Sequence, residues 1–236
     1  ELKSVVYIYK EFKKFLLKNN LINENWNGLN VLVQNASTTG LLDLKILQGK
    51  KEKSSFFFDG LKNKKFKLLY LLGSDNLEFQ KNDEFIVYQG SHGDRGAEIA
   101  DLILPSATYT EQSGLYENLE GRIQECKKAS YPIGEALEDW KVFNRIIKKL
   151  GFKDKTANFD ELRKEVLETV PNFSDINELP KKSVIKTNNI ETSFFSEKVF
   201  VRELDYYYTN SISRSSKTMS ECRQIRQKIK KDGTNN

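Results

Sequence analysis

The stretch that decides the fold spans residues 88–124 and reads YQGSHGDRGAEIADLILPSATYTEQSGLYENLEGRIQ. It starts at the end of one short apolar run and passes through a glycine-rich loop that holds the only histidine of the chain. It then enters a second apolar run, which Pro105 closes. Short apolar runs that end in Gly, Asp or Pro are typical of buried strands in a parallel sheet. The stretch therefore predicts an α/β fold.

The flanking sequence extends this prediction. Apolar runs predict strands over 68–72, 85–90 and 102–104, and a further short strand over 31–33 after an Asn-Gly turn. Helical spacing of apolar residues predicts helices near the N-terminus, over 138–150 and from 158 to Pro171. We expect an α/β fold with a doubly wound, mostly parallel sheet.

Composition divides the chain into three parts. Residues 1–170 read as the α/β domain, 171–191 as a polar connector, and 192–236 as a strand that continues into an extended basic tail. The net charge of the chain is +5. Residues 212–236 contain seven Lys or Arg and two Asp or Glu, a net charge of 7 − 2 = +5. The rest of the chain is therefore neutral overall.

Several classes of protein fit the composition poorly. The two cysteines, Cys126 and Cys222, lie far apart, which disfavours a disulfide framework. With one His and two Cys, the chain lacks the usual ligands of a structural zinc or iron–sulfur site. The longest apolar run, residues 68–72, is far shorter than the roughly 20 residues of a membrane helix.

The glycine-rich loop offers two interpretations. Gly90, Gly93 and Gly96 follow a strand and precede a helical turn, as in a phosphate-binding loop. Their spacing differs from the dinucleotide and P-loop patterns, and Asp94 would repel an anion, so a tight turn is the alternative. His92 is a candidate base or metal ligand, or else an ordinary loop residue.

Other charged residues also carry alternatives. Four carboxylates allow two interpretations: Asp101, Glu111, Glu117 and Glu120. They could take part in acid–base chemistry, or they could lie on a solvated surface and form salt bridges, for example with Arg122. Either cysteine would be reactive only with a depressed pKa. The basic end could bind RNA or anionic lipid, or dock on an acidic protein surface, which we favour.

The long stretch resembles the molybdopterin-oxidoreductase superfamily. Its pattern A-D-x-x-L-P-x-x-x-x-x-E-x-x-G-x-x-x-N-x-E-G-R-x-Q is carried here by Ala100, Asp101, Leu104, Pro105, Glu111, Gly114, Asn118, Glu120, Gly121, Arg122 and Gln124. Four segments, LLYLLGSDN, VYQGSHGDRGA, EDWKVF and YYYTNSISRSSKTMSEC, resemble one branch of it, the large iron–sulfur subunit of respiratory complex I. The resemblance covers most of residues 30–222 and leaves out the connector.

The resemblance implies that the sheet is of the molybdopterin-oxidoreductase type, present as a partial domain. It also implies a structural role. That branch is understood to have lost the molybdenum–pterin cofactor, so we expect no catalytic, metal or cofactor-binding residue in this chain. The loop residues would form a relic of the cofactor pocket: Gly90, His92, Gly93, Asp94, Gly96, Glu120 and Arg122. The resemblance places iron–sulfur clusters and FMN in partner subunits. The N-terminal iron–sulfur half would be a separate polypeptide or another part of a longer chain.

The expected partners are that half and other subunits of the peripheral arm, with Arg214, Lys217, Arg223 and Arg226 as docking residues. No nucleic acid is expected, and membrane contact only through the complex. We expect the mitochondrial inner membrane, on its matrix face, or in a bacterium the cytoplasmic face of the plasma membrane. Two rivals remain: a fragment of a true molybdopterin enzyme of the formate-dehydrogenase kind, and a basic-tailed module that binds RNA or a membrane surface.

Overall fold

The computed structural model describes residues 2–23, 26–30, 32–33, 35–46, 55–75, 79–153, 156–170, 173, 175–179 and 205–233. The chain divides into two compact units that alternate along the sequence. The first comprises Glu1–Gln48, Leu115–Glu125 and Arg163–Arg202. The second comprises Gly49–Gly114, Cys126–Leu162 and Glu203–Asn236. Among the described helices, none is both long and apolar enough to cross a membrane.

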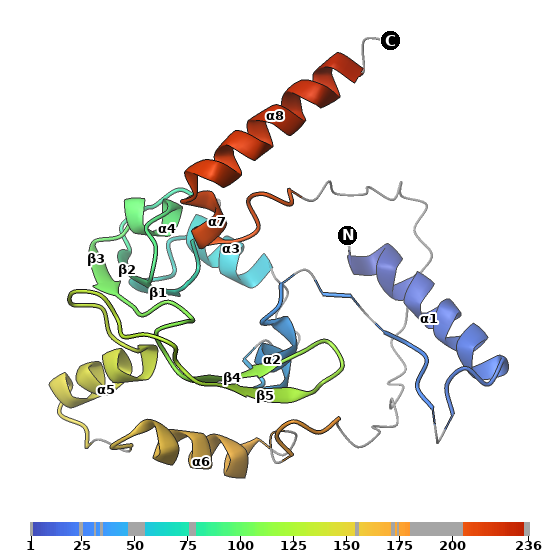
Figure 1. The fold of residues 1–236 in the computed structure, drawn as a ribbon, viewed down its shortest axis with the longest axis horizontal. Helices are drawn as coiled ribbons and strands as arrows, with labels where there is room; N and C mark the ends of the chain where they lie inside the picture. Colours follow the sequence, from blue (N-terminus) through green and yellow to red (C-terminus); the bar gives the residue numbers. More distant parts are fainter. Residues whose placement is uncertain are drawn as a thin grey trace. The chain divides into compact units, whose positions relative to one another are not determined.

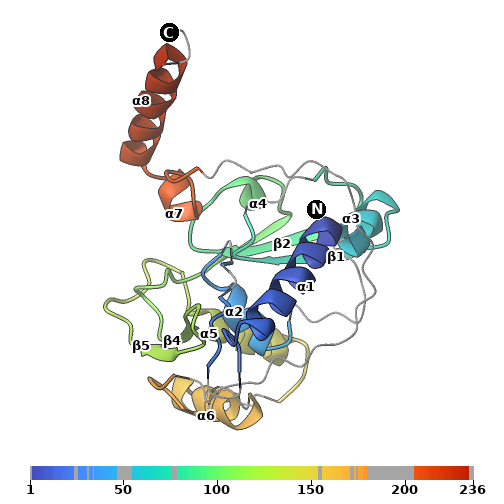
Figure 2. The same cartoon turned by 90° about the vertical axis from the view of Figure 1, so that its right-hand side faces the viewer.

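The second unit is built on a parallel sheet of three strands in the order β1-β2-β3. Its elements, in chain order, are α3 (Ser55–Lys62), β1 (Leu68–Leu72), β2 (Phe85–Gly90), α4 (Arg95–Glu98), β3 (Leu102–Pro105), α5 (Asp139–Lys149), α7 (Ser211–Arg214) and α8 (Lys217–Gly233) (Figures 1 and 2). The apolar runs over 68–72, 85–90 and 102–104 thus form the predicted strands. The α/β class with a parallel sheet is confirmed.

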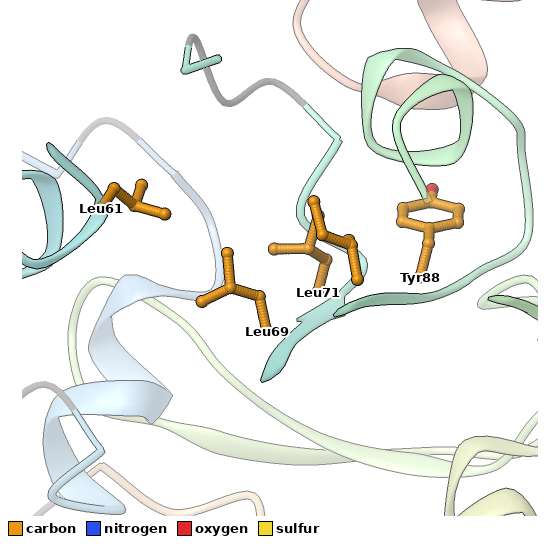
Figure 3. Packing of buried hydrophobic residues seen from close by; sticks show 5 residues of the cluster. Leu61, Leu69, Leu71 and Tyr88 are labelled. Atoms are coloured by element: carbon orange, nitrogen blue, oxygen red, sulfur yellow. The ribbon is translucent and has the colours of Figure 1, made fainter. Parts of the chain in front are cut away.

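One face of this sheet carries the core of the second unit. In the register, Leu69 pairs with Ile86, and Leu71 pairs with Tyr88. These four side chains and Leu61 of α3 form a buried cluster, and Figure 3 shows Leu61, Leu69, Leu71 and Tyr88 on the same side of the strands. Burying each such side chain contributes about 1.5–3 kcal/mol, so this cluster anchors α3 and α4 on the sheet.

Asp101 attaches the start of β3 to β2. Its backbone N–H donates to the Ile86 carbonyl at 2.8 Å, and its carboxylate accepts the Ile86 N–H, also at 2.8 Å. Lys81 adds an ion pair at 2.5 Å. The hydrogen bond from Lys81 holds the pKa of Asp101 below its usual value. Of the two interpretations of this residue, the geometry supports the structural one.

Helix α5 lies on the opposite face of the sheet near the strand ends. Phe143 stacks on Tyr70 of β1 with ring centroids 5.6 Å apart, and Val142 is buried. The predicted stop is confirmed, because Gly151 follows the C-cap with φ +83°, a conformation that side chains with a Cβ rarely adopt.

The first unit contains α1 (Leu2–Lys18), α2 (Thr38–Asp43), most of β4 (Gly114–Glu117) and β5 (Ile123–Cys126), and the second part of α6 (Phe159–Thr169). The strands β4 and β5 form a two-stranded sheet. Ile123 is almost fully buried, and its carbonyl accepts the Asn177 N–H at 2.7 Å. The N-terminal helix and the helix before Pro171 are both confirmed.

Two predictions of local structure differ from the fold. Leu32 and Val33 lie outside any strand and Leu32 is 84% exposed, whereas Val31 lies outside the described residues. The basic end, read as an extended tail, folds into α7 and α8. The strand predicted after residue 192 and most of the connector lie outside the described residues, so the boundaries at 170 and 191 stay predictions.

Candidate functional site

The glycine loop, residues 90–96, is shaped around the buried side chain of Tyr88. A Cβ on Gly90 would collide with the Tyr88 hydroxyl. A Cβ on Gly96 would lie 2.8 Å from the Ser74 carbonyl oxygen and 2.9 Å from the Tyr88 ring. The Tyr88 hydroxyl donates to the His92 carbonyl at 2.7 Å. The buried Tyr88 side chain therefore explains two of the three glycines.

His92 contributes its backbone to this packing. Its ring Nδ1 lies 3.0 Å from the Ser91 hydroxyl, and the ring is partly exposed. Among the described residues, no group of three or more His, Cys, Asp or Glu side chains could hold a metal ion. The local geometry therefore matches the interpretation of His92 as a loop residue.

Asp94 forms the second feature of the loop. Its carboxylate caps α4 by accepting the Arg95 N–H at 2.9 Å, and it also accepts the Nε of Arg214. Arg214 reaches Asp75, three residues beyond the end of β1, at 2.7 Å. We call Arg214, Asp75 and Asp94 the Arg214 cluster; it joins α7 to the carboxyl edge of the sheet.

The electrostatics of the Arg214 cluster favour the charged forms. The hydrogen bond from Arg214 is the main cause that lowers the pKa of Asp94. Burial alone would lower the pKa of Arg214, but its hydrogen bonds to Asp94 and Asp75 outweigh burial and raise it. Burial, together with the nearby carboxylates, raises the pKa of Tyr88. The cluster is thus a nearly closed set of paired charges.

A local signal in the sequence explains why α7 forms beside this edge. Asn210 and Ser213 make a capping box, in which the Asn210 side chain accepts the Ser213 N–H at 2.8 Å. The Ser213 hydroxyl accepts the Asn210 N–H at 3.0 Å. This Asn-x-x-Ser pattern is a helix-start signal that the prediction of an extended tail overlooks.

The basic residues of the C-terminal segment divide into two groups. Arg223 pairs with Asp205 at 2.5 Å and lies 4.6 Å from the Tyr208 ring centroid, and Arg226 lies 5.4 Å from that of Tyr206. Lys217 is 92% exposed and lies 4.0 Å from the Glu221 carboxylate. All four predicted docking residues therefore contact their own chain, and the docking role stays a prediction.

A buried polar network at the ends of β2 and β3 has no counterpart among the sequence predictions. Asp139 accepts hydrogen bonds from Gln89 at 2.7 Å, from Gln112 at 3.1 Å and from the Ser106 hydroxyl. The Tyr70 hydroxyl donates to Gln89, whose side chain is fully buried. From the sequence, Asp139 is only a favourable charge in the first turn of its helix. Its spacing from Gln89 gives no sign that the two meet.

Glu138 holds a second buried charge beside this network. Its carboxylate accepts bonds from Lys141 at 2.8 Å, Lys128 at 3.1 Å and the Trp140 ring N–H at 3.2 Å. Burial alone would raise the pKa of Glu138, but these three donors outweigh it and keep the pKa low. Both acidic residues before the tryptophan thus fasten α5 to the body of the second unit.

The Asn-x-Glu-Gly-Arg segment of the first unit forms the turn between β4 and β5. The Asn118 side chain accepts the backbone N–H groups of Glu120 at 3.0 Å and Arg122 at 2.9 Å. Gly121 has φ +82°, and the Arg122 guanidinium donates to the Asn177 carbonyl at 3.1 Å. This part of the motif therefore determines a turn, and Arg122 joins two segments of the chain.

Glu117, at the end of β4, meets a different environment. Burial, followed by the nearby Asp43 carboxylate and a hydrogen bond to it, raises the pKa of Glu117 to about 7. Of the two remaining carboxylates of the predicted set, Glu111 accepts the Thr108 N–H at 3.1 Å and Glu120 accepts the Asn118 side-chain N–H at 3.5 Å. The two cysteines are free and partly exposed.

The loop residues do not fit the anionic pterin cofactor that enzymes of the superfamily bind. The space beside Gly90 and Gly96 is filled by Tyr88, and the cap of α4 is occupied by the Asp94 carboxylate. Arg214, the cation beside the loop, already faces two carboxylates. An incoming anion at the start of α4 would meet the Asp94 carboxylate, and Arg214 is already paired with two carboxylates.

Comparison with known families and proteins agrees with this architecture. A family model described as molybdopterin oxidoreductase matches residues 3–149, and one described as the C-terminal part of the G subunit of NADH-ubiquinone oxidoreductase matches residues 176–222. The chain is 37% identical to the NADH-ubiquinone oxidoreductase 75 kDa subunit of Reclinomonas americana over 206 residues, which are 85% of this chain and 29% of that protein. It is 37% identical to the G subunit of the NADH-quinone oxidoreductase of Rickettsia typhi over 220 residues, 93% of this chain and 31% of that protein.

A mitochondrial relative gives the same result. The 78 kDa subunit of NADH-ubiquinone oxidoreductase from Neurospora crassa is 36% identical over 228 residues, 91% of this chain and 29% of that protein. The chain thus spans 29–31% of the length of these relatives. It belongs to the molybdopterin oxidoreductase family, as a partial domain of the kind found in the G subunit of NADH-quinone oxidoreductases.

Proposed function

We propose that this chain is a structural part of the peripheral arm of respiratory complex I, where it completes the large iron–sulfur subunit. The observation that carries the proposal is that two family models match successive parts of the same chain. A molybdopterin oxidoreductase domain is followed by the C-terminal domain of the G subunit. The relatives named for NADH-ubiquinone and NADH-quinone oxidoreductases match over 85–93% of the chain.

In this proposal the chain supports electron transfer from NADH to ubiquinone without holding a redox centre. Clusters and FMN belong to other polypeptides or to the iron–sulfur half of the large subunit. The composition supports this, because two cysteines and one histidine are too few for a cluster site of the usual kind. The glycine loop supports it as well, because its glycines accommodate Tyr88.

The proposed location is the matrix face of the mitochondrial inner membrane, or the cytoplasmic face of a bacterial membrane, with attachment through the complex. In this proposal, the exposed part of the basic C-terminal segment (residues 212–236) docks on partner subunits. Arg214 and Arg223 form less exposed ion pairs within the chain, and Arg226 lies over a tyrosine ring. Lys217 is 92% exposed even though it lies 4.0 Å from Glu221, so we assign docking to Lys217 and the exposed residues of α8.

The test is a native-gel separation of gently solubilised membranes, followed by mass spectrometry of the band that holds this chain. We expect it to migrate with NADH dehydrogenase activity and with cluster-bearing subunits. A small soluble particle that carries molybdenum would contradict the proposal and favour a true molybdopterin enzyme. Recovery with RNA, lost steeply as salt rises, would instead favour a nucleic-acid-binding module.

A further inference from the structure

The face of the β1-β2-β3 sheet opposite the core is only partly covered. Alternate residues of a strand share a face, and in the register Leu68 pairs with Phe85, and Val87 with Leu102. All four therefore lie on the face opposite Leu69 and Tyr88. Near the carboxyl ends of the strands, α5 and the Asp139 network cover this face, through Phe143 on Tyr70 and Asp139 on Gln89.

The other half of that face is exposed and apolar. Leu68 is 57% exposed, Phe85 47% and Leu102 44%. Leu68 and Phe85 pair at the starts of β1 and β2, and Leu102, at the start of β3, lies level with the buried Val87. We call Leu68, Phe85 and Leu102 the open apolar face. A parallel sheet almost always has both faces covered, because its crossover connections place helices on both sides. Three large apolar side chains on one uncovered half-face thus indicate a missing covering element.

The outer strand gives a second sign of incompleteness. β3 pairs with β2 alone among the described strands, and its four residues, LILP, carry no charge. Ile103 in this strand is 52% exposed. Natural edge strands are usually protected by charges or covered by another element. Among the described residues, no strand other than β2 pairs with the start of β3, whereas Leu137 pairs with Ser106, directly after its end, and donates to the Pro105 carbonyl.

The part of the protein that covers the open apolar face can be inferred from how much of the family domain this chain contains. The chain is a partial domain that spans 29–31% of its relatives' length. We propose that the open apolar face packs against the remainder of the molybdopterin-type domain of the large subunit, whether that part is another region or another polypeptide. The face carries no charge, so we expect apolar side chains on the occupant. The inference rests on the proposed function and identifies the surface through which the subunit is completed.

Site-specific photo-crosslinking in the assembled complex tests this directly. A benzophenone amino acid is placed at Phe85, at Leu102 and, as a control, at Ile133, which is 81% exposed on a loop of the same unit. The band with NADH dehydrogenase activity is isolated and its crosslinked peptides are identified. We expect crosslinks from Phe85 and Leu102 to the rest of the large subunit's molybdopterin-type domain. We expect no such crosslinks from the control position, Ile133.

Other products would overturn the inference. Crosslinks from Phe85 and Leu102 to α1 of the same chain, which exposes Phe12 and Phe15, would show internal covering. Crosslinks to a different subunit, or equal yields at Ile133, would also contradict it. A chain absent from the active band would contradict the proposed function itself, so the two failures are distinguishable.

A matched pair of substitutions gives an independent measurement. We expect Leu102→Glu to lower the fraction of the chain recovered in the complex, while Ile133→Glu leaves that fraction unchanged. Leu102 is 44% exposed and Ile133 81% in the chain itself, and neither belongs to the buried core cluster. Equal recovery of the two variants would argue against the open apolar face as the contact surface.

Discussion

Asp94 and Glu117 are two carboxylates of the same sequence stretch, and they meet opposite surroundings. Asp94, in the second unit, accepts hydrogen bonds from Arg214 and from a helix N–H, and its pKa is lowered. Glu117, in the first unit, is half-buried beside Asp43, and its pKa is raised to about 7. A carboxylate is stabilised when a cation is brought to it and destabilised when a like charge and burial act together. Substitutions around each carboxylate can test this difference.

The largest effect is expected where the backbone around Asp94 is most tightly packed. Gly96→Ala places a Cβ 2.8 Å from a backbone carbonyl and 2.9 Å from the Tyr88 ring, and should lower the free energy of unfolding by about 2–3 kcal/mol. Gly93→Ala is the matched control, because its Cβ would lie 3.8 Å from the nearest atom. Urea unfolding measures both, and equal midpoints would disprove the packing explanation of the loop.

The second-largest effect is expected for Arg214, whose hydrogen bond lowers the pKa of Asp94. Arg214→Met leaves Asp75 and Asp94 without their partner and should lower the free energy of unfolding by about 1–2 kcal/mol. This is less than for a fully buried set of charges, because the Asp94 side chain is 28% exposed although Asp75 is buried. Amide hydrogen exchange around α4 and α7 should accelerate. Lys217→Met, three residues away at a 92% exposed position, should leave exchange unchanged. Faster exchange in both variants would indicate a general effect of charge on the segment.

Arg214 also makes the stability of the region around α4 depend on pH, through Asp94. Because the folded-state pKa of Asp94 is lowered, its contribution to stability is present above the unfolded value and is lost as pH falls through the folded value. Wild-type protein should therefore lose protection at α4 in acid, below about pH 4. The Arg214→Met variant should show a weaker loss over that window.

The smallest effect is expected at Glu117, with the opposite sign. Its folded-state pKa is raised, so its contribution is favourable at low pH and is lost as pH rises through about 7. Glu117→Gln should remove that loss and increase stability at pH 8 by about 1 kcal/mol, after allowance for partial exposure. Exchange of β4 amides at pH 5 and pH 8 measures it. A variant that loses protection with pH as wild type does would show that Glu117 is not the titrating group.

A good part of the fold could be predicted because the strongest signals in the sequence are local. Residues 68–72 form a continuous apolar run, and Gly151 can adopt the left-handed conformation that ends a helix. The strand expected over 31–33 is wrong because a strand needs a neighbour, and periodicity does not report one. The helical C-terminal segment was not predicted, although the Asn210 capping box before α7 can be read from the sequence.

Taken alone, the sequence determined the parallel strands, the main helices and the family pattern, because each depends on residues a few positions apart. Only the tertiary structure decided what the glycine loop is for, since Gly96 meets Tyr88 and Ser74 across the fold. It also decided that Arg214, 120 positions from Asp94, pairs with that carboxylate. Such pairs depend on how the chain returns to one edge of the sheet, which spacing along the sequence does not encode.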